Sequence, residues 1–423
     1  MATINLRKVS KFTARGVSPS YVDYGGLLVL NQKCIRDQKI NTAPARLTDK
    51  EKNIGSNKKL QKFDILINST GVGTLGRVAQ VKYDLDATVD SHITIFRPAE
   101  FVEGQNKKVN PLYIGYCVRN QEKFIESKGA GATGQTELSK DSILDDVWIY
   151  LPDLPTQTRI ASVLSAYDDL IENDEKRIKV LEEMAQLLYT EWFVKFNFPN
   201  SPPREGWQAK PDGVVKYKDA GGKMVDSGTE YGLIPEGWEI VPIKKLADFM
   251  NGYPFKPKDL GDQGLPIIKI PELRSGILEK TPRNNGDGLS RKYIIQTGDI
   301  LFSWSATLLV NIWNFGEALL NQHLFKVTPK AQNYKAYTFY VLVLLVEKIR
   351  KHVVGATMQH LRKDTVESAK VLLPSTYVLT AYETKASKIL EQISLLYRKN
   401  QNLSKTRDLL IPQLVTGKRE LKN

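Results

Sequence analysis

The chain has 423 residues, of which 41% are hydrophobic and 25% charged. This length calls for more than one domain, and this composition excludes a disordered protein. Lysine and arginine exceed aspartate and glutamate by 60 to 47, so the net charge is +13. The excess favours an anionic partner such as nucleic acid, although solubility alone would also explain it.

Cysteine content and hydropathy predict a cytoplasmic protein. The two cysteines, Cys34 and Cys117, are too few for a disulfide framework or for a tetrahedral zinc site of their own. The longest apolar run, residues 339–346, is too short to cross a membrane. The N-terminus has no apolar segment followed by a small-residue cleavage site, so we expect no secretion signal.

In chain order, the sequence predicts five segments. They are a small α+β domain at 1–150, a long helix within 151–198, a glycine- and proline-rich linker at 199–232, a second α+β domain at 233–372, and a second long helix within 373–423. Strand patterns occur at 64–68, 93–96, 148–151, 267–270, 299–302 and 371–373, and helical patterns at 112–127, 156–196, 334–352 and 377–415.

The second half of the chain repeats the first. Five short matches occur in the same order, at 63–69 and 298–304, 91–93 and 322–324, 131–135 and 355–359, 140–141 and 363–364, and 151–152 and 373–374. The offset between matched residues falls from 235 at the first match to 222 at the last. A duplicated fold whose loops have changed length would give this pattern.

Each long helix carries one apolar stripe with alternating spacings of four and three residues, as in a coiled-coil seam. The stripes are Ile160, Leu164, Tyr167, Ile171, Ile178, Leu181, Ala185 and Leu188 in the first helix, and Tyr382, Ala386, Ile389, Ile393, Leu396, Leu403 and Leu410 in the second. A helix of this length with a narrow stripe needs a partner, and we expect each to be the other's. Asp174, Asn400 and Arg407 interrupt the seam, either to fix its register or where the helices diverge.

Three further motifs carry a family resemblance. They are Leu-Leu-Tyr-Thr-Glu-Trp-Phe-Val at 187–194 followed by Phe198-Pro199, Leu-Ile-Pro-Glu-Gly-Trp at 233–238, and Leu-Ile-Pro-Gln-Leu-Val-Thr-Gly at 410–417. With the duplicated helix, their order resembles the specificity subunits of type I restriction–modification systems. The resemblance covers essentially the whole chain.

The resemblance implies an α+β protein with two tandem target-recognition domains, separated by two long helices packed as an antiparallel coiled coil. Each domain would read one half of a split, asymmetric site in double-stranded DNA, and the helix pair would set the spacer. The implied partners are two adenine-N6 methyltransferase subunits and two ATP-dependent translocase/endonuclease subunits. S-adenosylmethionine, ATP and magnesium would belong to those partners, so we expect no cofactor or metal in this chain.

Two motifs imitate catalytic sites. Residues 71–76 match G-x-G-x-x-G, but residues 77–81 alternate like a strand where a dinucleotide site needs a helix, so we predict a hairpin loop. Asn110-Pro111-Leu112-Tyr113 resembles an amino-methyltransferase loop, yet no apolar strand precedes it, and a helix that begins with proline explains it better. His92 and His323 occupy equivalent positions in the repeat, which favours a structural or DNA-facing role over metal binding.

Base reading requires polar side chains on loops or helix starts. The candidates are Asn68, Ser69, Thr70, Arg77, Thr133 and Gln135 in the first domain, and Ser303, Ser305, Thr307, Thr357 and Gln359 in the second. Residues shared by both copies are poor discriminators of two different half-sites, so we expect specific readers where the copies differ, as at 31–60 and 251–295.

The interpretation is therefore a non-catalytic DNA-recognition scaffold. A basic coiled-coil tethering protein without sequence-specific DNA binding is the alternative. A solitary enzyme is disfavoured because no catalytic constellation is visible.

Overall fold

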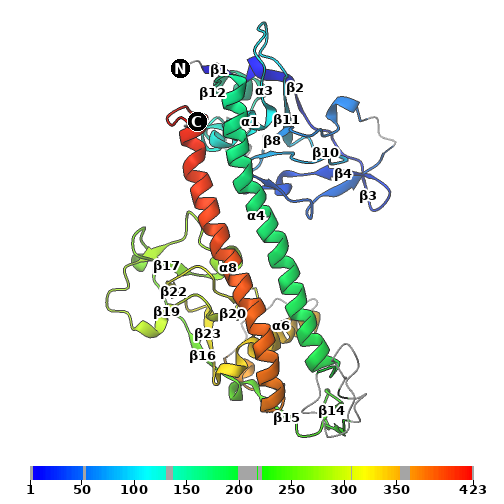
Figure 1. The fold of residues 1–423 in the computed structure, drawn as a ribbon, viewed down its shortest axis with the longest axis vertical. Helices are drawn as coiled ribbons and strands as arrows, with labels where there is room; N and C mark the ends of the chain where they lie inside the picture. Colours follow the sequence, from blue (N-terminus) through cyan, green and yellow to red (C-terminus); the bar gives the residue numbers. More distant parts are fainter. Residues whose placement is uncertain are drawn as a thin grey trace. The chain divides into compact units, whose positions relative to one another are not determined.

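The computed structural model describes residues 3–50, 54–129, 137–198, 217, 222–305, 307–352 and 363–421. The chain folds into two compact units, unit 1 (residues 1–171 with 403–423) and unit 2 (residues 172–402). Figure 1 shows two long helices, α4 (Leu154–Tyr189) and α8 (Thr376–Val415). Each of them is divided between the two units. Each unit therefore contains a part of both helices.

Unit 1 contains a mixed α+β domain. Its helices are α1 (Pro111–Asn120), α2 (Glu122–Ser127) and α3 (Lys140–Asp146). Its strands are β1 (Thr3–Asn5), β2 (Ser10–Arg15), β3 (Tyr21–Val22), β4 (Leu27–Leu30), β5 (Ile35–Arg36), β6 (Lys39–Ile40), β7 (Arg46–Thr48), β8 (Ile65–Asn68), β9 (Val78–Gln80), β10 (Ala87–Val89), β11 (Ile93–Pro98) and β12 (Trp148–Tyr150).

Unit 2 contains a domain of the same kind. Its helices are α5 (Ile270–Ser275), α6 (Lys335–His352) and α7 (Lys363–Glu367). Its strands are β13 (Met224–Asp226), β14 (Leu233–Pro235), β15 (Glu239–Pro242), β16 (Ala247–Asn251), β17 (Leu265–Ile268), β18 (Arg283–Asn284), β19 (Ile294–Ile295), β20 (Ile300–Ser303), β21 (Leu309–Ile312), β22 (Ala318–Leu320), β23 (Leu324–Pro329) and β24 (Lys370–Leu373). The strand and helix patterns in the sequence therefore predicted their elements to within a few residues.

One four-stranded sheet and one strand pair have the same topology in both domains, which confirms the repeat. The antiparallel sheet β2-β11-β8-β9 in unit 1 corresponds to β16-β23-β20-β21 in unit 2, and the pair β1-β12 corresponds to β15-β24. The registers also agree, since Ile65 pairs with Phe96 in one sheet and Ile300 with Val327 in the other.

The second sheet of each domain shows where the copies diverge. Both contain a parallel pair, β4 with β10 and β17 with β22, and an antiparallel neighbour, β7 or β18. The fourth strand is added at different edges, with β3 beside β7 in unit 1 and β19 beside β22 in unit 2. Strand β19 lies within 251–295, where the sequence predicted that the copies would differ, whereas β3 lies before the other predicted region, 31–60.

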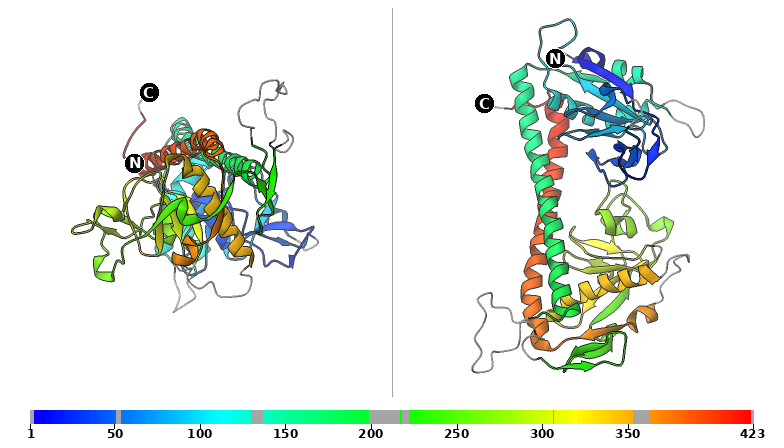
Figure 2. Two further views of the ribbon diagram at one scale, coloured as in Figure 1. Left: turned by 90° about the horizontal axis from the view of Figure 1, so that it is seen from below. Right: turned by 90° about the vertical axis from the view of Figure 1, so that its right-hand side faces the viewer.

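The helices pack antiparallel. In unit 1, Ile160 and Leu164 near the start of α4 share a buried cluster with Leu414 near the end of α8. In unit 2, Tyr189 at the end of α4 shares one with Tyr382 near the start of α8. Within each unit the two helix segments lie side by side (Figure 2). Ridges of apolar side chains spaced four and three residues apart make this seam.

The other predicted seam positions lie along the same stripe. Ile171, Ile178, Ala386, Ile393 and Leu396 are buried, and Tyr167, Leu181, Leu188, Ile389, Leu403 and Leu410 are half-buried. Among the buried helix residues that the stripe omitted is a charged one, Asp168, which lies next to Tyr167 in unit 1.

Candidate nucleic-acid interface

The loop between β8 and β9, residues 69–77, is exposed at its tip, at Val72 and Gly73. Strand β9 follows it and pairs antiparallel with β8, so the G-x-G-x-x-G motif opens no helix and forms a hairpin loop, as predicted. Its three glycines, Gly71, Gly73 and Gly76, all have positive φ, at 102°, 71° and 81°. A Cβ on Gly76 would lie 2.5 Å from Glu126 Cα, so only glycine allows the loop to meet α2 here.

Polar contacts with neighbouring side chains hold this loop in place. Gln32 Nε2 donates to the carbonyl oxygen of Thr70 at 2.9 Å and to its hydroxyl at 2.7 Å. The same hydroxyl lies 2.7 Å from His92 Nδ1. On the other side of the loop, Arg77 Nη2 donates to the carbonyl oxygen of Gly73 at 2.7 Å. These contacts hold the loop in one conformation before any ligand arrives.

Two predicted readers of the first domain are buried. Asn68 donates through Nδ2 to the Gln32 carbonyl at 3.1 Å, and Ser69 Oγ lies 2.6 Å from Thr94 Oγ1. Both side chains shape the loop and are not exposed to a base edge. Thr70 and Arg77 are half-buried and could still contact DNA. Thr133 and Gln135 lie outside the described residues.

The second domain gives a similar outcome. Ser303 is fully buried and donates to the carbonyl oxygen of Ser305, which is itself 4% exposed. Thr307 is half-buried, and its backbone N–H donates to the same carbonyl at 2.6 Å. Thr357 and Gln359 lie outside the described residues. Sequence reasoning selected polar residue types at strand ends but could not tell which side chains turn inward.

The methyltransferase-like motif is a helix start. Asn110 Oδ1 accepts a hydrogen bond from Tyr113 N at 3.1 Å, and Pro111 is the first residue of α1. Asn110 is thus an N-cap with proline after it, as predicted. His92 is exposed beside Thr70, whereas the His323 ring lies 6.0 Å from that of Trp304.

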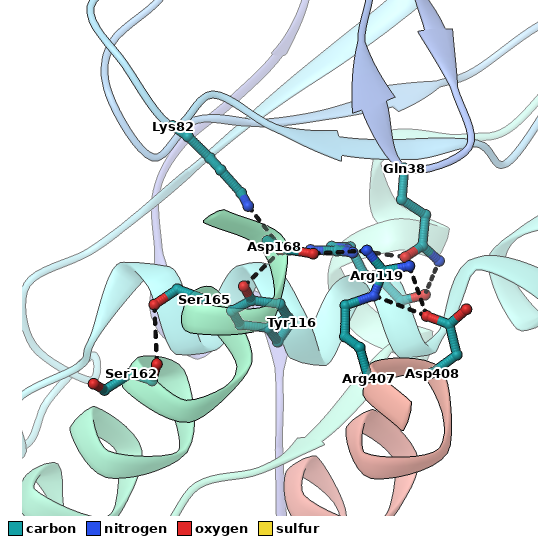
Figure 3. Close-up of polar contacts among 9 residues, drawn as sticks. All are labelled: Gln38, Lys82, Tyr116, Arg119, Ser162, Ser165, Asp168, Arg407 and Asp408. Carbon is teal, nitrogen blue, oxygen red and sulfur yellow. Dashed lines mark hydrogen bonds and ion pairs between the residues drawn. The ribbon is translucent and has the colours of Figure 1, made fainter. Parts of the chain in front are cut away.

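A buried ionic cluster centred on Asp168 joins the first domain to the helices of unit 1 (Figure 3). Asp168 on α4 is 8% exposed. Its Oδ2 accepts from Lys82 Nζ at 2.7 Å, Tyr116 Oη at 2.7 Å and Arg119 Nη1 at 2.8 Å, and its Oδ1 accepts from Arg407 Nη1 at 2.7 Å. One carboxylate therefore connects a loop of the domain, helix α1 and both long helices.

The charges in this cluster support each other. Burial alone would raise the pKa of Asp168, but the positive charges of Arg119 and Lys82 outweigh it and hold that pKa well below its usual range. The β5–β6 hairpin also positions Arg119, because Arg119 Nε donates to Gln38 Oε1 at 2.9 Å. Sequence reasoning missed this cluster, although Arg407 in an apolar seam was the signal that a buried carboxylate must face it.

In unit 2, aromatic rings form the junction between the recognition domain and the long helices. The Phe193 ring centroid lies 4.6 Å from that of Tyr337 and 4.8 Å from that of Tyr382. These three residues come from the π-helical turn after α4 (Thr190–Val194), from α6 and from α8. At the positions 222 residues from Asp168 and Arg407, unit 2 has Leu390 and Ala185.

Known proteins match this chain across both units. The sequence profile of the type I restriction modification DNA specificity domain matches residues 24–183 and again 235–405. The chain belongs to the type I restriction–modification DNA-specificity family. Each of the two matches runs from a recognition domain into the long helix that follows it.

Individual specificity subunits are similar over most of their length. The chain is 25% identical over 336 residues to the type I restriction enzyme MjaVIII specificity subunit of Methanocaldococcus jannaschii, covering 76% of this chain and 73% of that protein. It is 24% identical to the type I restriction enzyme HindI specificity subunit of Haemophilus influenzae, over 85% and 87% of the two chains. The crystal structure of a type I restriction–modification S subunit from M. genitalium shares the fold, with a TM-score of 0.56, 12% identity and coverage of 100% and 96%.

Membership of the specificity family confirms the predicted class of this chain. It is a DNA-specificity subunit with two recognition domains and no catalytic role, and the tethering alternative is not favoured. Within the described part of the chain, no group of three or more histidine, cysteine or acidic side chains is suited to a metal ion. None of the described helices is long and apolar enough to cross a membrane.

Proposed function

We propose that this specificity subunit reads a bipartite, asymmetric site in double-stranded DNA, one half-site with each recognition domain, and that α4 and α8 set the spacer. The observation that carries the proposal is the pair of domains with one topology and different edge strands, each built onto segments of both long helices. Equal topology provides two equivalent DNA-reading surfaces, and divergent edges provide two different sequences to read.

The recognition domains are proposed to lie at 1–150 and 233–372. The helical segment 151–198 and the linker 199–232 lie between them in the sequence, and the helical segment 373–423 follows the second domain. Two adenine-N6 methyltransferase subunits and two ATP-dependent translocase/endonuclease subunits are the proposed partners, in the cytoplasm. S-adenosylmethionine, ATP and magnesium would be bound by those partners. The net charge of +13 supports the affinity for DNA.

Methylome sequencing tests the proposal. The chain would be expressed with its methyltransferase partner in a host without other adenine methylation, beside a culture that lacks only this chain. We expect methylated adenines in one split motif with two unlike halves and a fixed spacer, and none in the control. Methylation spread over random sequence would contradict specific reading, and a single uninterrupted motif would contradict the two-domain reading.

Matched insertions in the helix pair test the ruler. Seven residues added to α4 within 172–180 and seven added to α8 within 394–402 keep the seam in phase, since a heptad restores the stripe. Seven residues lengthen a helix by about 10 Å, which corresponds to about 3 base pairs at 3.4 Å each. We expect a longer spacer with both half-sites unchanged. Altered half-sites with an unchanged spacer would contradict the ruler.

A further inference from the structure

The tip of the β8–β9 loop displays an apolar side chain with nothing packed over it. Val72 is 82% exposed, although it lies within a domain whose other valines in β4, β9 and β10 are buried. Isolated apolar residues on a surface are common and need no explanation by themselves. What distinguishes Val72 is the rigidity of the loop that carries it.

Three hydrogen bonds hold the backbone on both sides of Val72. Leu75 is buried in the core of the domain and donates its N–H to the Gly71 carbonyl at 3.0 Å. Arg77 holds the carbonyl of Gly73, and Gln32 holds Thr70, as described above. Valine adds rigidity of its own, because its branched Cβ restricts the side chain at χ1. The side chain is thus presented in a preorganised position at little entropic cost.

Among the residues that the structure describes, the corresponding loop of the second domain has no equivalent exposed apolar side chain. Its loop between β20 and β21, residues 304–308, is four residues shorter than residues 69–77 and contains no glycine. A feature present in one domain only can distinguish the half-site of that domain from the other. Thr70 and Arg77 are half-buried and engaged in holding the loop, whereas Val72 is the exposed apolar group that the loop presents to a ligand.

We propose that Val72 reads the 5-methyl group of a thymine in the major groove of the half-site bound by the first domain. The proposal rests on the DNA-reading function proposed above and names one specificity-determining contact within it. The thymine methyl is the apolar feature that distinguishes this base in the major groove, and small apolar side chains recognise it by contact. The branched side chain is too short to unstack bases as larger apolar wedges do.

Deoxyuridine substitution tests this contact, because uracil differs from thymine only by that methyl group. Binding of the chain with its methyltransferase subunits would be measured on duplexes in which each thymine of the motif is replaced in turn. For the wild type, we expect one position in one half-site to weaken binding about fourfold, which corresponds to ~0.8 kcal/mol for one buried methyl group. For Val72→Ala, we expect weaker binding to the thymine duplex and no further loss at that position.

Two controls make the result decisive. The deoxyuridine substitutions in the other half-site should affect Val72→Ala and the wild type equally, and Val72→Thr, which keeps the branched shape and one methyl, should give an intermediate loss. If the wild type binds its motif specifically but Val72→Ala responds to every substitution as the wild type does, the Val72 contact is wrong and the DNA-reading function stands. If the wild type shows no sequence preference, both proposals are overturned.

Discussion

The two recognition domains differ in how they are attached to the helices of their own units. Unit 1 uses a buried ionic cluster, and unit 2 uses a cluster of aromatic rings. In unit 1, the carboxylate of Asp168 holds three cations and a phenol. In unit 2, the equivalent helix positions are Leu390 and Ala185, and aromatic rings in edge-to-face contact fill the junction. A duplicated fold has thus kept its topology while changing what holds domain and helices together.

This difference predicts how the stability of each junction should respond to mutation. A buried ion cluster depends most on the member that the others share, because losing Asp168 leaves Arg119 and Arg407 buried without their common carboxylate. An aromatic cluster loses stability in proportion to the volume removed. The two junctions should therefore respond differently to a lost partner, to acid and to compensating changes.

Asp168→Leu should give the largest effect. It leaves Arg119 and Arg407 buried with no carboxylate between them, and removing one partner of a buried ion pair costs about 3–5 kcal/mol. The free energy of unfolding would be measured in urea, with hydrogen exchange to assign the loss to unit 1, because a two-unit protein need not unfold in one step. Unchanged exchange in α1 and α8 would contradict the role of this cluster.

A compensating variant sharpens that result. The triple variant Asp168→Leu, Arg407→Ala and Arg119→Val gives unit 1 the residues that unit 2 has at the equivalent positions. Val343 is the equivalent of Arg119 when Tyr113 is aligned with Tyr337. Lys82 is 28% exposed and can turn to solvent. We expect the triple variant to lie within about 1–2 kcal/mol of the wild type, far above the single variant. A loss equal to the sum of the three single losses would contradict the coupling.

Phe193→Ala should weaken unit 2 by about 3 kcal/mol, because it removes a buried ring from the centre of the aromatic junction. The same urea and hydrogen-exchange measurements apply, with the loss now in unit 2. Leu187→Ala is the matched control, since Leu187 lies near the same end of α4 and is 61% exposed, and it should change stability by less than about 0.5 kcal/mol. Equal losses for both variants would mean that the rings are not the junction.

Acid should destabilise unit 1 through Asp168. An unfolded aspartate has a pKa near about 4, and the folded pKa of Asp168 is lower because of Arg119 and Lys82. The stabilisation by this group is therefore complete above pH ~4 and is lost as the pH falls toward the folded pKa, by about 1–2 kcal/mol over the accessible range. Stability measured from pH 6 to pH 2.5 should show the wild type approaching Asp168→Leu. A constant difference between them would contradict this.

The sequence predicted the elements and the repeat better than it predicted the sites. Hydrophobic periodicity and the residues that end helices and strands predicted α4, α8 and several buried strands, among them β8, β11 and β20, because these depend on local pattern. Asn68, Ser69, Ser303 and Ser305 were selected as DNA readers, yet their side chains are buried, because a strand end does not reveal which way its last residues point. Asp168 was missed because its partners Lys82, Arg119 and Arg407 lie between 49 and 239 residues away in the chain.

Lys399→Met should give the smallest effect, although it also removes a cation from a buried carboxylate. Asp174 is 1% exposed and lies 2.9 Å from Lys399 Nζ, but Lys399 is 44% exposed and Arg177 is a second cation at 3.6 Å from the same carboxylate. With one cation still in place and water near the other, we expect a loss of about 1 kcal/mol or less in unit 2. Lys176→Met, on the exposed face of α4, gives the baseline for losing a surface ion pair. A loss as large as that of Asp168→Leu would show that Asp174 depends on Lys399 alone. The expected difference in stability between the two variants would then be absent.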